Sequence, residues 1–155
     1  MSYTSDLDRV VRDVLKSGRI GEPVFVRCTA GVEGDNAAHR RAIGRLAAAV
    51  SSWLNDPAER VWAVASPGSG STSLMIEFRR GATALLATTS PGAAGLATDL
   101  VILGNRGAAY HEGLIARSGP FETTDEPRPS KPLHEAIERA IESGQPVAIG
   151  LEGAP

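Results

Sequence analysis

The histidines and the single cysteine are the side chains of this sequence whose chemistry most often serves catalysis or metal binding. His39, His111 and His134 lie in three separate segments of the chain. A metal site would need them to converge with carboxylates, and their spacing follows none of the patterns typical of zinc ligands. Cys28 lies in an apolar stretch, where a free cysteine behaves as a small buried hydrophobic residue. We therefore expect no metal site and no catalytic cysteine.

A glycine- and serine-rich segment, Ser66–Thr72 (SPGSGST), superficially resembles a phosphate-binding loop. It lacks the lysine that such a loop requires, and it joins two expected strands instead of a strand and a helix. The chain also lacks the G-x-S-x-G turn that carries the serine nucleophile of many hydrolases. No G-x-G-x-x-G follows any expected strand, so no dinucleotide fingerprint is present. The segment is predicted to be a hairpin loop, and we expect no catalytic residues and no cofactor.

One candidate pocket remains, at the start of an expected helix over residues 36–54. Asp35 or the asparagine that follows it would cap this helix. Asp35 and His39 are four residues apart, so their side chains can share a helical face. Free N–H groups at a helix N-terminus favour anions. Asp35, His39 and Arg40 therefore form a candidate pocket for an acidic metabolite or a sugar.

A competing interpretation gives the same residues a structural role. His39 falls on the apolar stripe of the helix, together with residues such as Ile43 and Leu46. Three arginines lie mostly off that stripe and would form a solvated face: Arg40, Arg41 and Arg45.

The elements that must position these side chains follow from periodicity. Apolar residues recur at helical spacing between Ser5 and Gly18, over residues 36–54 and over residues 130–143, whereas from Glu59 onward the period is two. The expected strands are Pro23–Thr29, Glu59–Ser66, Ser71–Arg79, Ala82–Ser90, Asp99–Leu103 and Ala108–Glu112, with a short one within residues 146–150. The strand at residues 108–112 would close an antiparallel meander. This order predicts an α+β fold: a single mainly antiparallel sheet with helices packed on one face.

Length and composition limit the remaining possibilities. The 155 residues fit one domain, residues 1–155, and the apolar (42%) and charged (22%) fractions are those of a globular protein. A net charge of −2 argues against nucleic acid as a partner. The N-terminal residues lack the apolar core of a signal peptide, and no stretch approaches the ~20 apolar residues of a membrane span. We therefore expect a cytoplasmic domain without a membrane partner.

Four sequence segments resemble, in the same order along the chain, segments of the C-terminal, non-Rossmann domain of the Gfo/Idh/MocA oxidoreductase family. A helix ends in Ser17-Gly18-Arg19-Ile20-Gly21-Glu22-Pro23 just before the first strand, and the sheet segments lie at Leu74–Thr88 and Leu100–Ala108. The fourth segment is the late helix Leu133–Pro146 (LHEAIERAIESGQP). The resemblance covers about three quarters of the chain. It implies a free-standing C-terminal domain, since the family's N-terminal Rossmann domain has no counterpart here.

The resemblance also implies where the family's catalytic groups would lie. They follow the pattern D-x-G-x-H-x-x-D on the long helix, shortly before a tryptophan–leucine pair. Counting back from Trp53 places the pattern on Ala42, Gly44, Leu46 and Ala49, where only the glycine is retained. An alternative register, seven residues earlier, matches Asp35 and His39 but places the second acid on Ala42.

Two functions from different classes follow. The first is a non-catalytic oligomerisation or binding module, because in the family the broad sheet of this domain commonly packs on another copy. The partner would be a second copy or a separate Rossmann-type subunit. The expected second sheet face combines Met75, Ala63, Ala65 and Leu85 or Leu86 with threonine and serine. The alternative is an enzyme or small-molecule-binding protein that uses Asp35 and His39.

The missing dinucleotide fingerprint generates a first prediction. Titration of the protein with NADH or NADPH in a calorimeter should give no measurable heat of binding, because no strand–turn–helix offers its N–H groups to a pyrophosphate. A stoichiometric complex of micromolar affinity would contradict the interpretation as a free-standing C-terminal domain.

Overall fold

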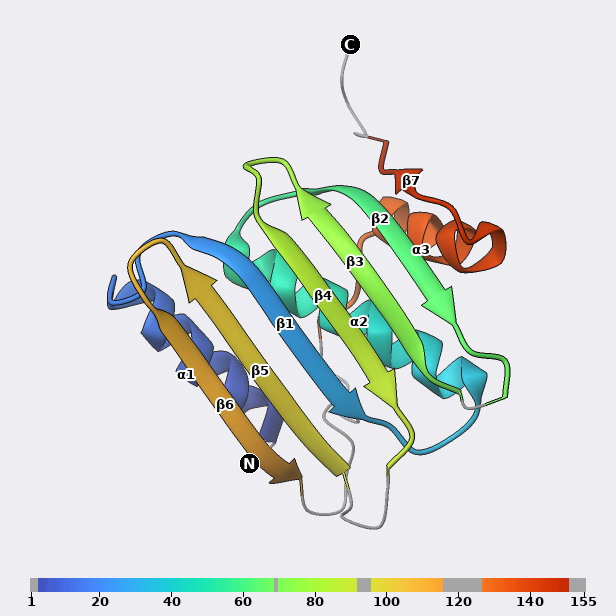
Figure 1. The fold of residues 1–155 in the computed structure, drawn as a ribbon, viewed down its shortest axis with the longest axis horizontal. Helices are drawn as coiled ribbons and strands as arrows, with labels where there is room; N and C mark the ends of the chain where they lie inside the picture. Colours follow the sequence, from blue (N-terminus) through green and yellow to red (C-terminus); the bar gives the residue numbers. More distant parts are fainter. Residues whose placement is uncertain (1–2, 69, 92–95, 116–126, 151–155) are drawn as a thin grey trace.

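The computed structural model describes residues 3–68, 70–91, 96–115 and 127–150. This part of the chain forms three helices and seven strands (Figure 1). In order they are α1 (Tyr3–Lys16), β1 (Pro23–Gly31), α2 (Asn36–Leu54), β2 (Ala58–Ala65), β3 (Thr72–Phe78), β4 (Thr83–Thr89), β5 (Leu96–Gly104), β6 (Ala108–Ile115), α3 (Lys131–Ser143) and β7 (Val147–Ala148). Five of the strands, β2 to β6, follow one another directly. The α+β class predicted from the sequence is confirmed.

The strands form one mixed, mostly antiparallel sheet in the order β6-β5-β1-β4-β3-β2-β7. Strand β1 lies inside the sheet between β5 and β4, parallel to β4 and antiparallel to β5. The predicted meander is therefore wrong at one junction, since β4 and β5 follow one another in the chain but are separated by β1. Periodicity identifies a strand but not its neighbours, so this insertion leaves no mark in the pattern of residues.

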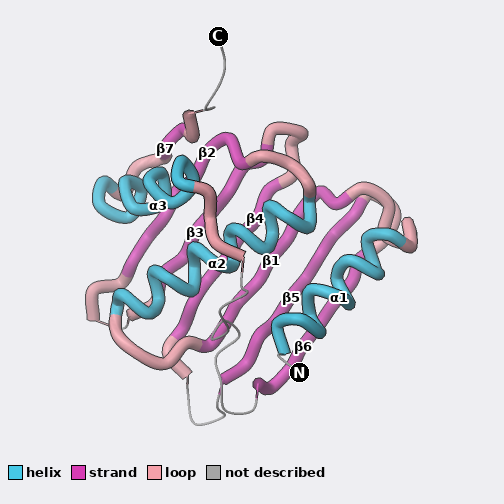
Figure 2. The backbone as a smooth tube through the Cα atoms, turned by 180° about the vertical axis from the view of Figure 1, so that it is seen from behind, coloured by secondary structure: helices cyan, strands magenta, loops and turns pink. Residues whose placement is uncertain are grey.

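All three helices lie on the same face of the sheet, as predicted (Figure 2). Helix α2 packs across β1, β3 and β4, and α3 packs on β2. The opposite face carries no element of the described part of the chain (Figure 1). The sheet therefore has a covered face and an open face.

Helix α2 begins and ends at local signals that the sequence carries. The Asp35 carboxylate accepts a hydrogen bond from the Ala38 N–H at 2.9 Å, which satisfies one of the free donors of the first turn. Asn55 ends the helix in the left-handed conformation, with φ of 47°, and Pro57 follows two residues later. The whole predicted apolar stripe is buried: His39, Ile43, Leu46, Ala47, Val50, Trp53 and Leu54.

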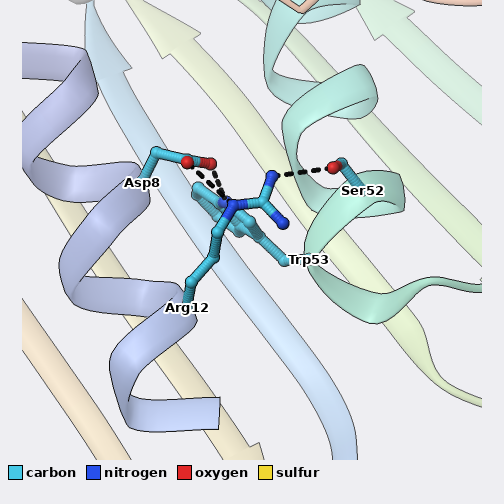
Figure 3. A network of polar contacts seen from close by, with 4 residues as sticks. All are labelled: Asp8, Arg12, Ser52 and Trp53. Carbon is cyan, nitrogen blue, oxygen red and sulfur yellow. Dashed lines mark hydrogen bonds and ion pairs between the residues drawn. The ribbon is translucent and has the colours of Figure 1, made fainter. Parts of the chain in front are cut away.

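A polar network joins α1 to the end of α2 (Figure 3). The Asp8 carboxylate accepts hydrogen bonds from Trp53 Nε1 and Arg12 Nε, both at 2.8 Å. Arg12 also donates to Ser52 Oγ at 2.9 Å. Burial acts to raise the pKa of Asp8, but the hydrogen bonds from Arg12 and Trp53 outweigh it and lower the pKa below its usual value. The charged carboxylate thus anchors the N-terminal helix to α2.

Alternation along the strands divides apolar residues between the two faces. In β3, Leu74, Ile76 and Phe78 are buried under the helices, while Met75 points to the open face. Two expectations for the open face are wrong: Ala63 is 1% exposed and lies on the covered face, and Ala65 shares that face by alternation. Of the pair Leu85 or Leu86, Leu85 lies on the open face and Leu86 is buried. In β2 the open face carries Trp62 and Val64 instead. The choice of face follows from where the helices pack, which the period of two leaves undetermined.

Leu46 generates the prediction of this subsection, because it is 1% exposed in the contact between α2 and the sheet. The substitution Leu46→Ala should lower the free energy of unfolding by about 2–5 kcal/mol, through lost apolar burial and the cavity left behind. Urea melts followed by circular dichroism measure this change. Arg41→Ala on the exposed side of the same helix is the control and should cost less than about 0.5 kcal/mol. Equal losses in the two variants would contradict the packing of α2.

Candidate functional site

His39 lies wholly buried between α2 and the sheet. Its Nδ1 lies 3.0 Å from Thr88 Oγ1, and the Thr88 hydroxyl donates in turn to the Thr72 carbonyl at 3.5 Å. A Thr88 hydroxyl that donates to that carbonyl can accept from Nδ1–H, which is the arrangement of a neutral ring with its proton on Nδ1. Nε2 has no hydrogen-bond partner among the described residues. The ring is thus held as a neutral imidazole.

Gly70 closes the site over His39. It has φ of +69°, and a Cβ at this position would lie 3.0 Å from both Cδ2 and Nε2 of the histidine ring. A side chain at Gly70 would therefore press on the imidazole as well as strain the backbone. Burial lowers the pKa of His39, and the nearby Asp35 carboxylate opposes that effect without cancelling it.

The three candidate pocket residues have different surroundings. Asp35 is exposed and uses its carboxylate to cap α2. His39 points toward Thr88 on the covered face of the sheet. Arg40 forms an ion pair with Glu138 of α3, with 2.8 Å between Nη1 and Oε2. The structure therefore brings His39 to β4 and Arg40 to α3, on different sides of the same helix.

The positions that the family pattern would occupy are apolar and packed. Ala42, Leu46 and Ala49 are 7%, 1% and 6% exposed. Gly44 lies against Pro129, whose Cγ would be 3.5 Å from an added Cβ. None of these side chains can transfer a proton. The alternative register does not form a catalytic set either. In it Asp35 caps the helix, His39 is buried, and the second acid is replaced by Ala42.

A hollow lies on the outer side of α2, and the sequence analysis did not identify it as a site. It has a volume of about 540 Å³ and lies between α2, α3 and the segment that leads into α3. Its polar lining consists of Arg40, Arg41 and Arg45 from α2, Arg128 from the preceding segment, and His134 and Glu138 from α3. The spacing of the three α2 arginines was visible in the sequence, but only the fold shows that Arg128 joins them.

Within the described ranges, no group of three or more His, Cys, Asp or Glu side chains is placed to hold a metal ion. His111 lies on β6 opposite Leu100, and His134 is exposed on α3, so neither meets His39. Burial raises the pKa of the Cys28 thiol to about 12, which keeps it protonated and unreactive. No helix of the described chain is long and apolar enough to cross a membrane.

Comparison with known proteins gives matches to solved structures only. The sequence matches no protein-family model, and no curated protein matches it either. The fold is similar to that of a probable dehydrogenase from Thermotoga maritima, with a TM-score of 0.70 at 10% identity over 94% of this chain and 62% of that one. It is equally similar to myo-inositol dehydrogenase from Lactobacillus casei, solved with NAD(H) and myo-inositol, with a TM-score of 0.70 at 17% identity over 96% and 60%.

The WlbA dehydrogenase from Bordetella pertussis, solved with NADH and UDP-GlcNAcA, matches with a TM-score of 0.62 at 17% identity over 93% of this chain and 60% of that one. At these identities the likeness establishes the fold alone. The chain spans about 60% of the length of the dehydrogenases that it matches. It therefore has the α+β fold of the C-terminal domain of the Gfo/Idh/MocA dehydrogenases.

Proposed function

We propose that this chain is a non-catalytic assembly domain that packs the open face of its sheet on the same face of a second copy. The observation that carries the proposal is a row of directly paired residues that crosses six strands on that face. From one side to the other the row reads Trp62, Met75, Leu85, Arg27, Val101 and Tyr110.

Five of these six side chains are apolar or aromatic, and several are far from buried. Trp62, Leu85 and Tyr110 are 42%, 40% and 73% exposed. Val64 extends the patch along β2 and is 53% exposed. A contiguous exposed patch of this kind is typical of an interaction surface and uncommon on a monomer.

The size of the open face suits a dimer of identical copies. Six strands about 4.8 Å apart, with seven to nine residues at about 3.3 Å each, span roughly 750 Å². This is close to the ~800 Å² per partner of an interface of standard size. Two such faces would pack as sheet on sheet, the arrangement that the resemblance to the family implies.

The charges on the open face are close to balanced, which favours a second copy over a strongly charged partner. Arg60 pairs with Glu77 across the strands, with 3.5 Å between Nη1 and Oε2. Arg27 is diagonal to Asp99 on the neighbouring strand, and Glu112 lies opposite Asp99. Two mixed surfaces of this kind can meet without a large repulsion between like charges.

The alternative function, an enzyme or sugar-binding protein that uses Asp35 and His39, has less support. His39 is 0% exposed and the Gly70 backbone lies against its ring, so a substrate would have to displace residues that cover it. The resemblance also implies a second partner, a separate Rossmann-type subunit. The measurement that tests the dimer tests this partner too, because a protein that is monomeric in isolation would favour the Rossmann-type subunit over a second copy.

The dimer generates a prediction about mass in solution. Light scattering at a chain concentration on the order of 100 μM should give about twice the chain mass of 16.2 kDa. That concentration exceeds the micromolar-to-picomolar dissociation constants of interfaces of this size. Met75→Glu should raise the dissociation constant at least about tenfold, because the residues opposite it, Trp62 and Leu85, are apolar and its carboxylate would be buried without a partner. Val10→Glu on α1 is the matched control, since Val10 is 47% exposed but lies on the helix side.

The control variant should remain dimeric, and circular dichroism verifies that both variants fold. A mass of one chain for the unmodified protein at this concentration would overturn the proposal. Dissociation of both variants to the same extent would also overturn it.

His39 supplies a prediction that separates a structural from a chemical role. Because its pKa is lowered in the folded protein, the unfolded chain binds the proton first as the pH falls. The stability that the neutral ring contributes is complete above about pH 6.5 and is lost as the pH falls from there toward the lowered folded value. Urea melts between pH 7.5 and 5 should show this decline.

The decline should be smaller in His39→Gln and unchanged in His134→Gln, whose histidine is exposed on α3. Parallel pH dependence in all three proteins would contradict the structural role. So would a metabolite that stabilises the unmodified protein but not His39→Gln.

A further inference from the structure

The side of α2 that faces away from the sheet has a regular composition of its own. Ala37, Arg40, Arg41, Gly44 and Arg45 are spaced i, i+3, i+4, i+7 and i+8, which places them on one helical face. This face is roughly opposite the buried stripe that contains His39, Ile43 and Val50. Interpreted from the sequence alone, it is a solvated basic face. In the structure, α3 and the segment before it lie opposite this face and enclose a hollow with it.

The wall opposite α2 consists of α3 and the segment before it. Ser130 caps α3, because its Oγ accepts a hydrogen bond from the Leu133 N–H at 3.4 Å. The residues just before this cap, Arg128 and Pro129, line the hollow together with α2 (Figure 2). Pro129 lies beside Gly44, so that a Cβ added at Gly44 would make ordinary van der Waals contact with the proline ring. The result is the hollow of about 540 Å³ with an apolar floor of Ala37, Gly44 and Pro129.

The charge of this pocket is unlike that of the chain as a whole. Among the described residues that line it are four arginines and one glutamate, in a chain whose net charge is −2. Glu138 is already paired with Arg40 at 2.8 Å, and this ion pair holds the Arg40 guanidinium at the wall between the helices. Arg41 and Arg128 are exposed, so their guanidinium groups can turn toward a ligand.

We infer that this pocket binds a small organic molecule that carries two or more anionic oxygen groups, phosphate or carboxylate. Guanidinium groups match both groups through paired hydrogen bonds. The volume lies within the ~300–1,000 Å³ of small-molecule sites, and the apolar floor suits a carbon skeleton. Of the positions of the family's catalytic pattern, Gly44 lies in the floor of this pocket, whereas Ala42, Leu46 and Ala49 are buried on another side of α2.

Calorimetric titration with three probes tests the inference. Fructose 1,6-bisphosphate represents the phosphates, citrate represents the carboxylates, and fructose is the uncharged control. At least one of the two anions should bind with 1:1 stoichiometry, fructose should not bind, and affinity should fall as sodium chloride is raised. The anion that binds identifies which oxygen group the arginines prefer.

Two double variants locate the site. Arg41→Gln with Arg128→Gln removes two charges from the pocket and should weaken binding at least tenfold. Arg79→Gln with Arg139→Gln removes two charges from exposed positions outside it and should leave the affinity unchanged. All four arginines are exposed, so both proteins should keep the unmodified melting temperature in the absence of ligand.

Three results would overturn the inference. They are the absence of 1:1 binding by both anions, equal weakening in the two double variants, and binding of a polyglutamate peptide when neither small anion binds. The last result would assign the pocket to an acidic protein segment. None of these results bears on the dimer, because the pocket and the open face lie on opposite sides of the sheet.

Discussion

The packing of the apolar stripe of α2 on the covered face of the sheet is the contact on which the rest of the structure depends. The stripe crosses β1, β3 and β4, so it joins an N-terminal strand to two strands that come after the helix in the chain. It fixes the rotation of α2 about its own axis. Once the stripe faces the sheet, His39 must be buried beside Thr88, and the arginines must point away.

The insertion of β1 between β4 and β5 has a second consequence. The resulting sheet has seven strands, and the three helices of the described chain all cover the same face of it (Figure 2). The open face therefore keeps a row of large side chains that nothing in the described chain covers. The hydrophobic effect acts on both faces alike, which is why we propose that a second copy covers this row.

The likeness to dehydrogenases of known structure makes the differences on α2 informative. A catalytic helix needs side chains that hold and transfer protons, yet the corresponding positions here are Ala42, Leu46 and Ala49. At these positions this side of the helix packs tightly in the core. The polar residues of α2 are instead on its outer side, where Arg40 meets Glu138 and the other arginines surround the hollow.

Local chemistry determined a large part of this structure. Asp35 before a helical apolar pattern predicts where α2 begins, and Gly18 and Gly144, both with positive φ, are the expected ends of α1 and α3. The alternation of Leu74, Met75 and Ile76 predicts a strand with two unlike faces. Such signals depend on neighbours within a few residues, so the sequence carries them completely.

What the tertiary structure alone decided are the contacts between distant segments. Periodicity could not show that β1 enters between β4 and β5, since strand pairing depends on backbone hydrogen bonds that every residue can make. It could not show that Ala63 faces the helices while Trp62 remains exposed, because a period of two defines two faces without saying which one is covered. It also could not bring Arg128 to the arginines of α2, because that meeting depends on where α3 docks.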